Sequence, residues 1–401
     1  ILILTCTLGV LVSLPFGQIP PLAPLLDPNH GFWQNSFSED QLAEESLNLE
    51  NLNAAVEVVY DEQLIPHIYA ENELDLYRAQ GYITAKHRLW QMEFQTRAAA
   101  GRLSEIVGPM ALELDRMTRR KGLAYGAEKG ISYLTENDPA TLALVEAYAD
   151  GVNKFARDNP KKVNAKLHPI TKEDVIAGSY IQHLFFAGLD RDLAVMSNHV
   201  STAIPTGSNA IAVNGAKSEG ESSFLLINSH QPLAGPVGWY ELNVKSESGW
   251  SAHGGNFPGS FVVNVGFNES IGWGATVNKP DVLDIFELTI NPNNSNEYLL
   301  DDVWTPFEIE KDYLQIKLLG FLKIKIKQNF KYSEFGPVLE LKDKAFALRH
   351  ATQNSFQEID GWFALNEAQS VQAFESALSS RKIPSFNFVV MDASQNIGFF
   401  Y

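Results

Sequence analysis

Apolar and polar positions follow two different spacings along this chain of 401 residues, and the change falls near Ser208. Before it, apolar residues recur at intervals of three or four, which is the spacing of one face of a helix. After it, short apolar runs and alternating stretches are bounded by Gly, Pro, Asn and Asp, as is typical of strands and turns. The pattern predicts an α+β protein with a largely helical first half and a strand-rich second half.

Three long helices are predicted in the first half, each behind a residue whose side chain can accept a hydrogen bond from the first turn. They run from Glu73 to about Ala100 behind Asn72, from Pro139 onward behind Asp138, and from Lys172 to about Phe186 behind Thr171. Gly101 is a suitable stop for the first helix, because glycine readily adopts the left-handed conformation that often follows a helix. Asp174, three residues after Thr171, completes a pattern close to a capping box.

Strands are predicted where apolar residues alternate with polar ones or form short apolar runs. They are Val56–Tyr60, a strand that ends at Ala70, the alternation that follows Ser208, Phe224–Ile227, Trp239–Val244, Phe261–Val265, two lysine-bearing strands within Leu314–Phe330, and Phe386–Asp392. The alternating lysines are expected to form a solvated face. A last helix is predicted from Asn366 to about Ser380.

Charge and composition narrow the class of protein. The net charge of −17 argues against nucleic acid or anionic membrane surfaces as partners, since excess carboxylate repels both. Residues 1–20 open with the apolar run Ile1–Gly17, which predicts a signal peptide or an uncleaved membrane anchor. We favour the anchor, with the enzyme outside the cytoplasm, in the periplasm. Cys6 lies in this run and is the only cysteine, which excludes intramolecular disulfides and a Cys-based zinc site.

Gly207-Ser208 is followed by an ordered series of polar and aromatic motifs. They are Asn228–Pro232, Trp239–Glu241, Phe257–Gly259 and Gly266–Thr276, and the first half adds Gly81–Gly108. Together they resemble the penicillin acylase family of N-terminal-nucleophile hydrolases, from about Leu25 to Tyr401. The resemblance implies a four-layer αββα core that cuts itself between Gly207 and Ser208. Residues 21–207 would form the α-subunit region with any spacer, and residues 208–401 the first part of the β-subunit. The two would form a heterodimer, and the chain would be the N-terminal part of a precursor whose β-subunit continues beyond Tyr401.

The implied chemistry follows from what the cut creates. A serine hydroxyl is a poor nucleophile unless a base takes its proton, and a free α-amine with a pKa of roughly 7.7–8.0 can be that base. By the resemblance, Ser208 is the nucleophile and its own amine the base. The oxyanion donors would be the backbone N–H of Val277 and the side-chain amide of Asn387. His230 would have a supporting role beside the amine.

Other positions are assigned by the same resemblance. Gln231, Val265 and Ala275 would line the acyl pocket. Because phenylacetyl-specific members carry rings where Gln231 and Val265 stand, we expect linear aliphatic acyl groups to be preferred. Asp281, Leu283 and Asp284 align with a structural calcium loop of some members, and oxygen ligands of this kind suit calcium. No cofactor is expected for catalysis. His67, in a Pro-His-Ile pattern of the family, is expected to be structural.

The function predicted is an autoprocessing amidohydrolase that cleaves the amide bond of small N-acylated compounds through an acyl-enzyme on Ser208. One alternative is an acyl-homoserine lactone acylase that quenches signalling between cells. Another is a non-catalytic relative that serves as a binding protein of the cell envelope. Only a protein that processes itself would yield two chains on a denaturing gel, which separates the enzyme from the non-catalytic relative.

Overall fold

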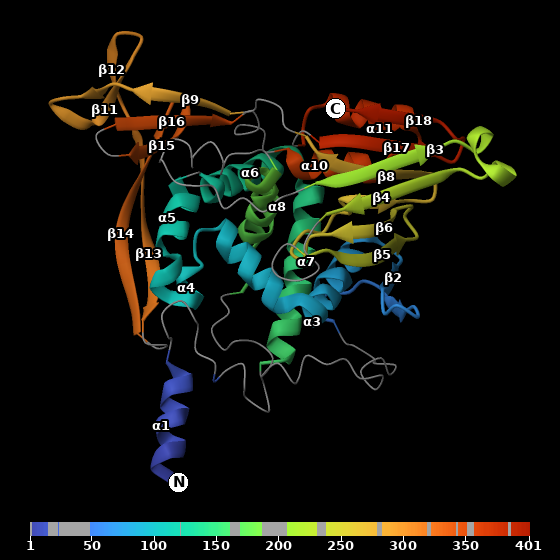
Figure 1. Ribbon diagram of the computed structural model, residues 1–401, viewed down its shortest axis with the longest axis horizontal. Coiled ribbons are helices and arrows are strands. Elements are labelled where there is room, and N and C mark those ends of the chain that lie inside the picture. Colours follow the sequence, from blue (N-terminus) through green and yellow to red (C-terminus); the bar gives the residue numbers. More distant parts are fainter. Residues whose placement is uncertain are drawn as a thin grey trace.

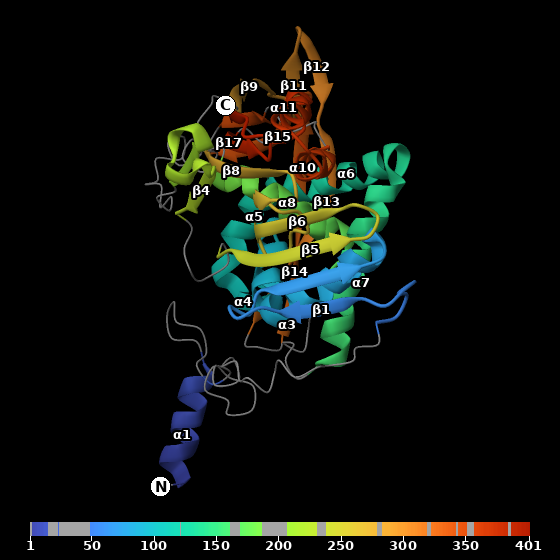
Figure 2. The same cartoon turned by 90° about the vertical axis from the view of Figure 1, so that its right-hand side faces the viewer.

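The computed structural model describes residues 2–14, 23, 49–120, 122–160, 169–186, 207–230, 238–278, 283–318, 322–341, 344–350, 357–383 and 386–401. The largest sheet of the described residues has eight strands in the order β1-β2-β5-β6-β7-β8-β17-β18. The strands are β1 (Glu57–Tyr60), β2 (Pro66–Ala70), β5 (Tyr240–Ser246), β6 (Ser251–Asn256), β7 (Val265–Phe267), β8 (Ile271–Val277), β17 (Phe386–Asp392) and β18 (Ile397–Phe400). Figure 2 shows β1, β5 and β6 in front of α3 and α7.

The sheet joins the two halves of the chain. Its strands pair antiparallel except at β2 and β5, which run parallel and come from before and after Ser208. The N-terminal hairpin β1–β2 is therefore an edge of the same sheet that carries the later strands. A cut at residue 207 would leave two chains held together by this ladder of backbone hydrogen bonds.

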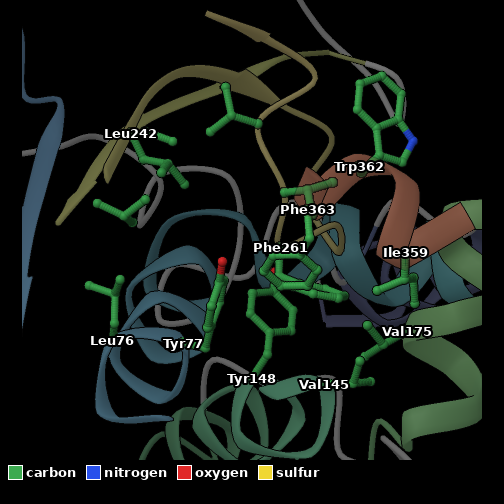
Figure 3. Packing of buried hydrophobic residues seen from close by; sticks show 14 of the residues in the cluster. Leu76, Tyr77, Val145, Tyr148, Val175, Leu242, Phe261, Ile359, Trp362 and Phe363 are labelled. Atoms are coloured by element: carbon green, nitrogen blue, oxygen red, sulfur yellow. The ribbon is translucent and has the colours of Figure 1, made fainter. Parts of the chain in front are cut away.

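Helices cover one face of the sheet. They are α3 (Glu73–Ala99), α7 (Pro139–Asp158), α8 (Lys172–Phe186), α10 (Glu358–Asn366) and α11 (Val371–Ser379). Glycines 81 and 151 let α3 and α7 cross closely, because a Cβ on either would collide with the backbone of the other helix. Figure 3 shows Tyr77, Tyr148 and Phe363 gathered around Phe261, which lies 5.6–5.8 Å from each of them between ring centroids.

The hairpin of β3 (Ser208–Val213) and β4 (Phe224–Ser229) lies on the opposite face, against β8. Successive side chains of a strand point to opposite faces. Trp273 of β8 is fully buried toward the helices, near Phe374 of α11. A Cβ on Gly274, by contrast, would lie 3.0 Å from Ala210 Cβ of β3. Glycine at this position lets the hairpin lie close to the sheet. Two short 3₁₀ turns, η4 (Gly215–Lys217) and η5 (Glu219–Glu221), join its strands.

A second β region extends away from the main sheet, at the left of Figure 1. It contains a five-stranded sheet of order β13-β14-β15-β16-β9 and a small sheet of order β10-β11-β12. The strands are β9 (Leu283–Leu288), β10 (Ile290–Asn291), β11 (Asn294–Leu300), β12 (Val303–Pro306), β13 (Glu308–Leu318), β14 (Leu322–Ser333), β15 (Gly336–Leu341) and β16 (Lys344–His350). One side of the β13–β14 ribbon packs on α4 (Ser104–Val107), η3 (Gly108–Ala111) and α5 (Leu112–Arg120).

The predicted helices of the first half are confirmed at their start sites. Asn72 accepts a hydrogen bond from the Asp75 N–H at 3.0 Å, Asp138 from Thr141, and Thr171 from Asp174. One feature of α3 was not predicted. Arg88 interrupts it with non-helical angles, φ −137° and ψ 19°. Helices α4, α5, α6 (Leu123–Asn137) and α10 were not predicted either.

Most predicted strands are confirmed, including the two lysine-bearing strands, now β13 and β14, and Phe386–Asp392, now β17. The strand predicted over Phe261–Val265 is wrong. Only Val265 belongs to a strand, because Phe261 enters the aromatic core and Asn366 holds the N–H and the C=O of Val263 with two hydrogen bonds of 2.9 Å. The last helix begins at Val371, five residues after the predicted start, because Ser370 is its N-cap. At the N-terminus, α1 (Leu2–Ser13) is exposed, and within the described residues no helix is long and apolar enough to cross a membrane.

Candidate active site

Ser208 is the first residue of β3, beside the main sheet. Its Oγ donates a hydrogen bond of 2.5 Å to the carbonyl oxygen of Gly207, so the hydroxyl lies against the peptide group that precedes it. Ser229 of β4 is its cross-strand neighbour. The two polar residues Ser208 and Asn209 begin β3 and are followed by the apolar residues 210–213.

His230 lies on the other side of the same peptide group. Its backbone N–H donates to the Gly207 carbonyl at 3.0 Å, and its Nε2 lies 3.1 Å from Asn209 Nδ2. A Cβ on Gly207 would come within 2.9 Å of the His230 Nδ1. A glycine at 207 therefore gives the imidazole room to lie against the bond that is predicted to be cut.

Val277 and Asn387 lie next to each other where β8 ends and β17 begins. Asn387 is paired with Thr276, and its Nδ2 donates a hydrogen bond of 3.1 Å to the Val277 carbonyl. Phe388, the next residue, contacts Phe374 on the helix side, so Asn387 points to the face that carries the β3–β4 hairpin. The two predicted oxyanion donors thus come from adjacent strands on the Ser208 side of the sheet.

A cavity opens beside these residues, with an empty volume of about 360 Å³ that includes the space at its mouth. It is lined by residues from the hairpin, the main sheet, the loop before β7 and α10. They are Ser208, Ser229, Trp239, Phe257, Asn264, Val265, Ala275, Thr276, Val277, Trp362 and Phe386. The cavity therefore contains Ser208 and Val277 together with Val265 and Ala275. Gln231 lies outside the described residues.

The walls of the cavity are aromatic. Trp239 and Phe257 stack with their ring centroids 4.3 Å apart, and Trp362 lies 6.0 Å from Phe386. None of these four rings was predicted from the sequence to line the pocket. Trp239 and Phe257 could have been noticed, because both stand in motifs of the ordered series, but no local signal pointed to Trp362 or Phe386.

No titratable side chain is found among the described residues that line the cavity. The described residues of this wall thus supply no carboxylate, lysine or histidine as a base for the Ser208 hydroxyl. His87 is not one of the lining residues, and its Nδ1 lies 2.7 Å from the Tyr240 hydroxyl and its Nε2 3.3 Å from the Tyr60 hydroxyl. Burial lowers the pKa of His87 to about 4, so it is neutral near pH 7 and ties α3 to β5. Gln91 adds a hydrogen bond of 2.9 Å to the Gly238 carbonyl, next to Trp239.

The remaining assigned residues lie elsewhere. His67 Nδ1 lies 3.1 Å from Asn243 Nδ2 and its Nε2 3.3 Å from Asp61, outside the cavity, which fits the structural role expected of it. Asp281 of the predicted calcium loop lies outside the described residues. Leu283 begins β9, and Asp284 is exposed opposite Arg349 of β16. Within the described part of the chain, no three His, Cys, Asp or Glu residues form a group that could hold a metal ion.

Comparisons with known proteins show the family to which the chain is related. The family model for penicillin amidase matches residues 55–401. Acyl-homoserine lactone acylase PvdQ of Pseudomonas fluorescens (strain Pf0-1) is 24% identical over 369 residues, which cover 82% of this chain and 47% of that protein. Penicillin acylase 2 proenzyme of Pseudomonas sp. (strain SE83) is 39% identical over 110 residues, 27% of this chain and 14% of that one. The chain spans about half the length of the PvdQ relatives it matches.

Among solved structures, thermostable penicillin G acylase from Alcaligenes faecalis in orthorhombic form matches with a TM-score of 0.36 and 24% identity. That match covers 41% of this chain and 29% of the other.

Proposed function

The chain belongs to the penicillin amidase family, and from this premise we propose that it forms part of an autoprocessing amidohydrolase for small N-acylated compounds. The observation that carries the proposal is the position of Ser208. Its hydroxyl lies against the Gly207 carbonyl on one side and borders an apolar cavity without titratable walls in the described residues on the other. A serine placed in this way needs a base from outside the cavity wall, and its own α-amine becomes one once the chain is cut.

The first reaction is the cut. Ser208 Oγ adds to the carbonyl carbon of Gly207, the C–N bond between the two residues breaks, and its nitrogen takes up the hydroxyl proton. The resulting ester is hydrolysed by water, which leaves a carboxylate on Gly207 and a free amine on Ser208. His230 N–H, at 3.0 Å from the Gly207 carbonyl oxygen, is placed to stabilise the negative charge that develops there.

The second reaction is substrate turnover. The Ser208 amine takes the hydroxyl proton while Oγ attacks the carbonyl carbon of the substrate amide. The Val277 N–H and the Asn387 amide stabilise the oxyanion. The amide C–N bond then breaks, the leaving amine takes the proton, and the acyl group stays on Ser208 as an ester. Water, activated by the same amine, releases the carboxylic acid and restores the serine.

Other features fit this proposal. The outer face of the β3–β4 hairpin exposes Ile211 (55%), Phe224 (56%) and Leu226 (51%), as expected of a strand pair that further strands and helices cover in a four-layer αββα core. Residues 21–207 would hold the α-subunit region with any spacer and residues 208–401 the first part of the β-subunit, and the two subunits would form a heterodimer. The apolar N-terminal segment supports an extracytoplasmic location with residues 1–20 as anchor or signal peptide.

A structural calcium ion at Asp281, Leu283 and Asp284 stays a prediction.

The substrate class has two candidates. The first is N-acyl amides in general. The second is acyl-homoserine lactones, which are favoured by the names of the relatives that align over 82% of the chain. A panel of N-acyl amides that includes both classes, assayed with the complete gene product, would separate them.

Processing is the decisive experiment. Intact-mass measurement of the complete wild-type product should show a second chain that begins at Ser208. Ser208→Ala should stay as one chain and be inactive, because no hydroxyl attacks Gly207. Ser208→Cys should still be cut, because a thiol supports the same acyl shift. An active wild-type protein that remains uncut would overturn the proposal, and an uncut, inactive one would favour the non-catalytic relative.

A further inference from the structure

Asn264 stands out among the residues of the cavity wall. It lies directly before β7 and is only 3% exposed. Its backbone N–H donates a 3.0 Å hydrogen bond to the Gly255 carbonyl, which holds the residue in place. Neither amide atom of its side chain, Oδ1 or Nδ2, has a hydrogen-bond partner among the described residues.

Two other buried asparagines in this region have hydrogen-bond partners for their side chains. Asn366 is bound to both backbone groups of Val263, and Asn268 donates to the carbonyls of Asn366 and Ala368 at 2.8 Å. These side chains hold the chain around β7 in its shape. Because burying an amide without partners is unfavourable, an asparagine that holds no part of the fold is expected to bind something else.

The position of Asn264 indicates what that is. Asn264 is one of the residues that line the same cavity as Ser208 and Val265, and the other walls are mainly aromatic and aliphatic. A purely hydrocarbon acyl group in this cavity would offer neither atom of this buried amide a partner. An acyl group with a hydroxyl avoids this, since a hydroxyl can accept from Nδ2 or donate to Oδ1, whichever atom faces it.

Resting on the proposed function, we propose that Asn264 is a specificity-determining residue that selects acyl groups carrying a hydroxyl. The aromatic walls bury the carbon part of the acyl group, while the asparagine recognises its oxygen. This refines the expectation of linear aliphatic groups drawn from Gln231 and Val265, because the acyl group would be aliphatic and hydroxylated.

The test compares matched substrates in two proteins. N-acyl amides of one chain length and one leaving amine are prepared without a hydroxyl and with a hydroxyl at each successive carbon. We expect wild type to favour at least one hydroxylated isomer by about tenfold in kcat/KM, the size of one net hydrogen bond. In Asn264→Leu, which keeps the shape and removes both polar atoms, the plain acyl group should be preferred. Equal kcat/KM for all isomers in wild type, or the same preference in both proteins, would overturn the proposal.

Thr276→Val is the matched control, since it also replaces a polar group of the cavity wall with an apolar one of similar size. Thr276→Val should keep the wild-type preference for hydroxylated acyl groups. Loss of this preference in Thr276→Val would contradict a specific role for Asn264. Self-cleavage at Ser208 reports that each variant has folded. Asn264→Leu should also raise Tm, because it removes a buried amide without partners, whereas a structural asparagine would give a lower Tm.

Failure of the proposed function can be distinguished from failure of the inference about Asn264. If wild type hydrolyses no acyl amide, the proposed function fails, and the inference is then decided by binding of the free acids. Plain and hydroxylated carboxylic acids of the same length are compared by thermal shift. A larger shift with a hydroxy acid in wild type that is lost in Asn264→Leu supports the role of Asn264, and equal shifts in both proteins overturn it.

Discussion

The eight-stranded sheet and the β13–β14 ribbon are both built mainly from antiparallel strands, but they differ in how their faces are covered. In the main sheet, helices lie on one face and the β3–β4 hairpin on the other. Neighbouring residues of β8 are therefore both packed, Trp273 near Phe374 of α11 and Gly274 against Ala210 of β3. In the ribbon, Leu314 and Ile316 are buried on one face, while lysines such as Lys325 are exposed. Figure 1 shows the ribbon at the opposite side of the molecule from the hairpin.

This difference explains why the candidate site lies on the main sheet. A sheet covered on both faces holds each side chain by contacts from two layers, which is what a group aimed at a developing charge requires. A strand with one solvated face places no such constraint on its outer residues. Substitutions of similar size should therefore have large effects on the main sheet and small effects on the ribbon.

The largest contrast is expected at Asn387. Losing one oxyanion donor typically lowers turnover by about 100- to 1000-fold, so Asn387→Ala should lower kcat by that amount with little change in the affinity for an unreacted acyl amide. Steady-state kinetics on the processed protein measure this. Asn329→Ala, the same change on the exposed side of the ribbon, serves as control and should keep wild-type turnover. Unchanged kcat in Asn387→Ala would indicate that Asn387 has only a structural role.

A smaller effect is expected at Gly274. A Cβ there would already lie 3.0 Å from Ala210 Cβ and 3.1 Å from Ile227 Cγ1, and the two methyl groups of valine need further room. Gly274→Val should therefore push the hairpin off the sheet, destabilise the protein by about 1–3 kcal/mol and slow self-cleavage at Ser208. Denaturant unfolding and the rate of appearance of the second chain report both effects.

Gly178→Ala in α8 is the control for Gly274. Among the described residues, the atom nearest to its Cβ would be Thr96 Cγ2 at 3.9 Å, so alanine should stabilise the helix by about 0.5–1 kcal/mol. A Gly274→Val protein as stable as wild type would show that the hairpin is not held against β8 as described.

The smallest effect is expected on the ribbon. Lys325 is exposed and pairs across the strands with Gln315, so Lys325→Gln should change the free energy of unfolding by no more than about 0.5 kcal/mol. Chemical denaturation checks this. A loss above about 1 kcal/mol would mean that the outer face of the ribbon is covered in the complete protein, and the contrast between the two regions would then disappear.

The sequence alone determined the features that depend on near neighbours. The caps of α3, α7 and α8 were predicted because a short polar side chain binds an N–H only two or three residues away. The strand Phe386–Asp392 was predicted because alternation of apolar residues is a local signal. The role of Ser208 was predicted from the resemblance that the ordered motifs carry, and it stays a prediction.

Only the tertiary structure decided whether an apolar run forms a strand or an irregular segment of the core. Phe261–Val265 has the composition of a strand, yet Phe261 belongs to a ring cluster with Tyr77 and Tyr148, which are more than 100 residues away in the chain. The aromatic cavity walls depend on the same long-range packing. The burial of Asn264 without partners also depends on long-range packing. Whether a buried amide has a hydrogen-bond partner depends on which segments fold over it, and the neighbouring residues in the sequence do not determine this.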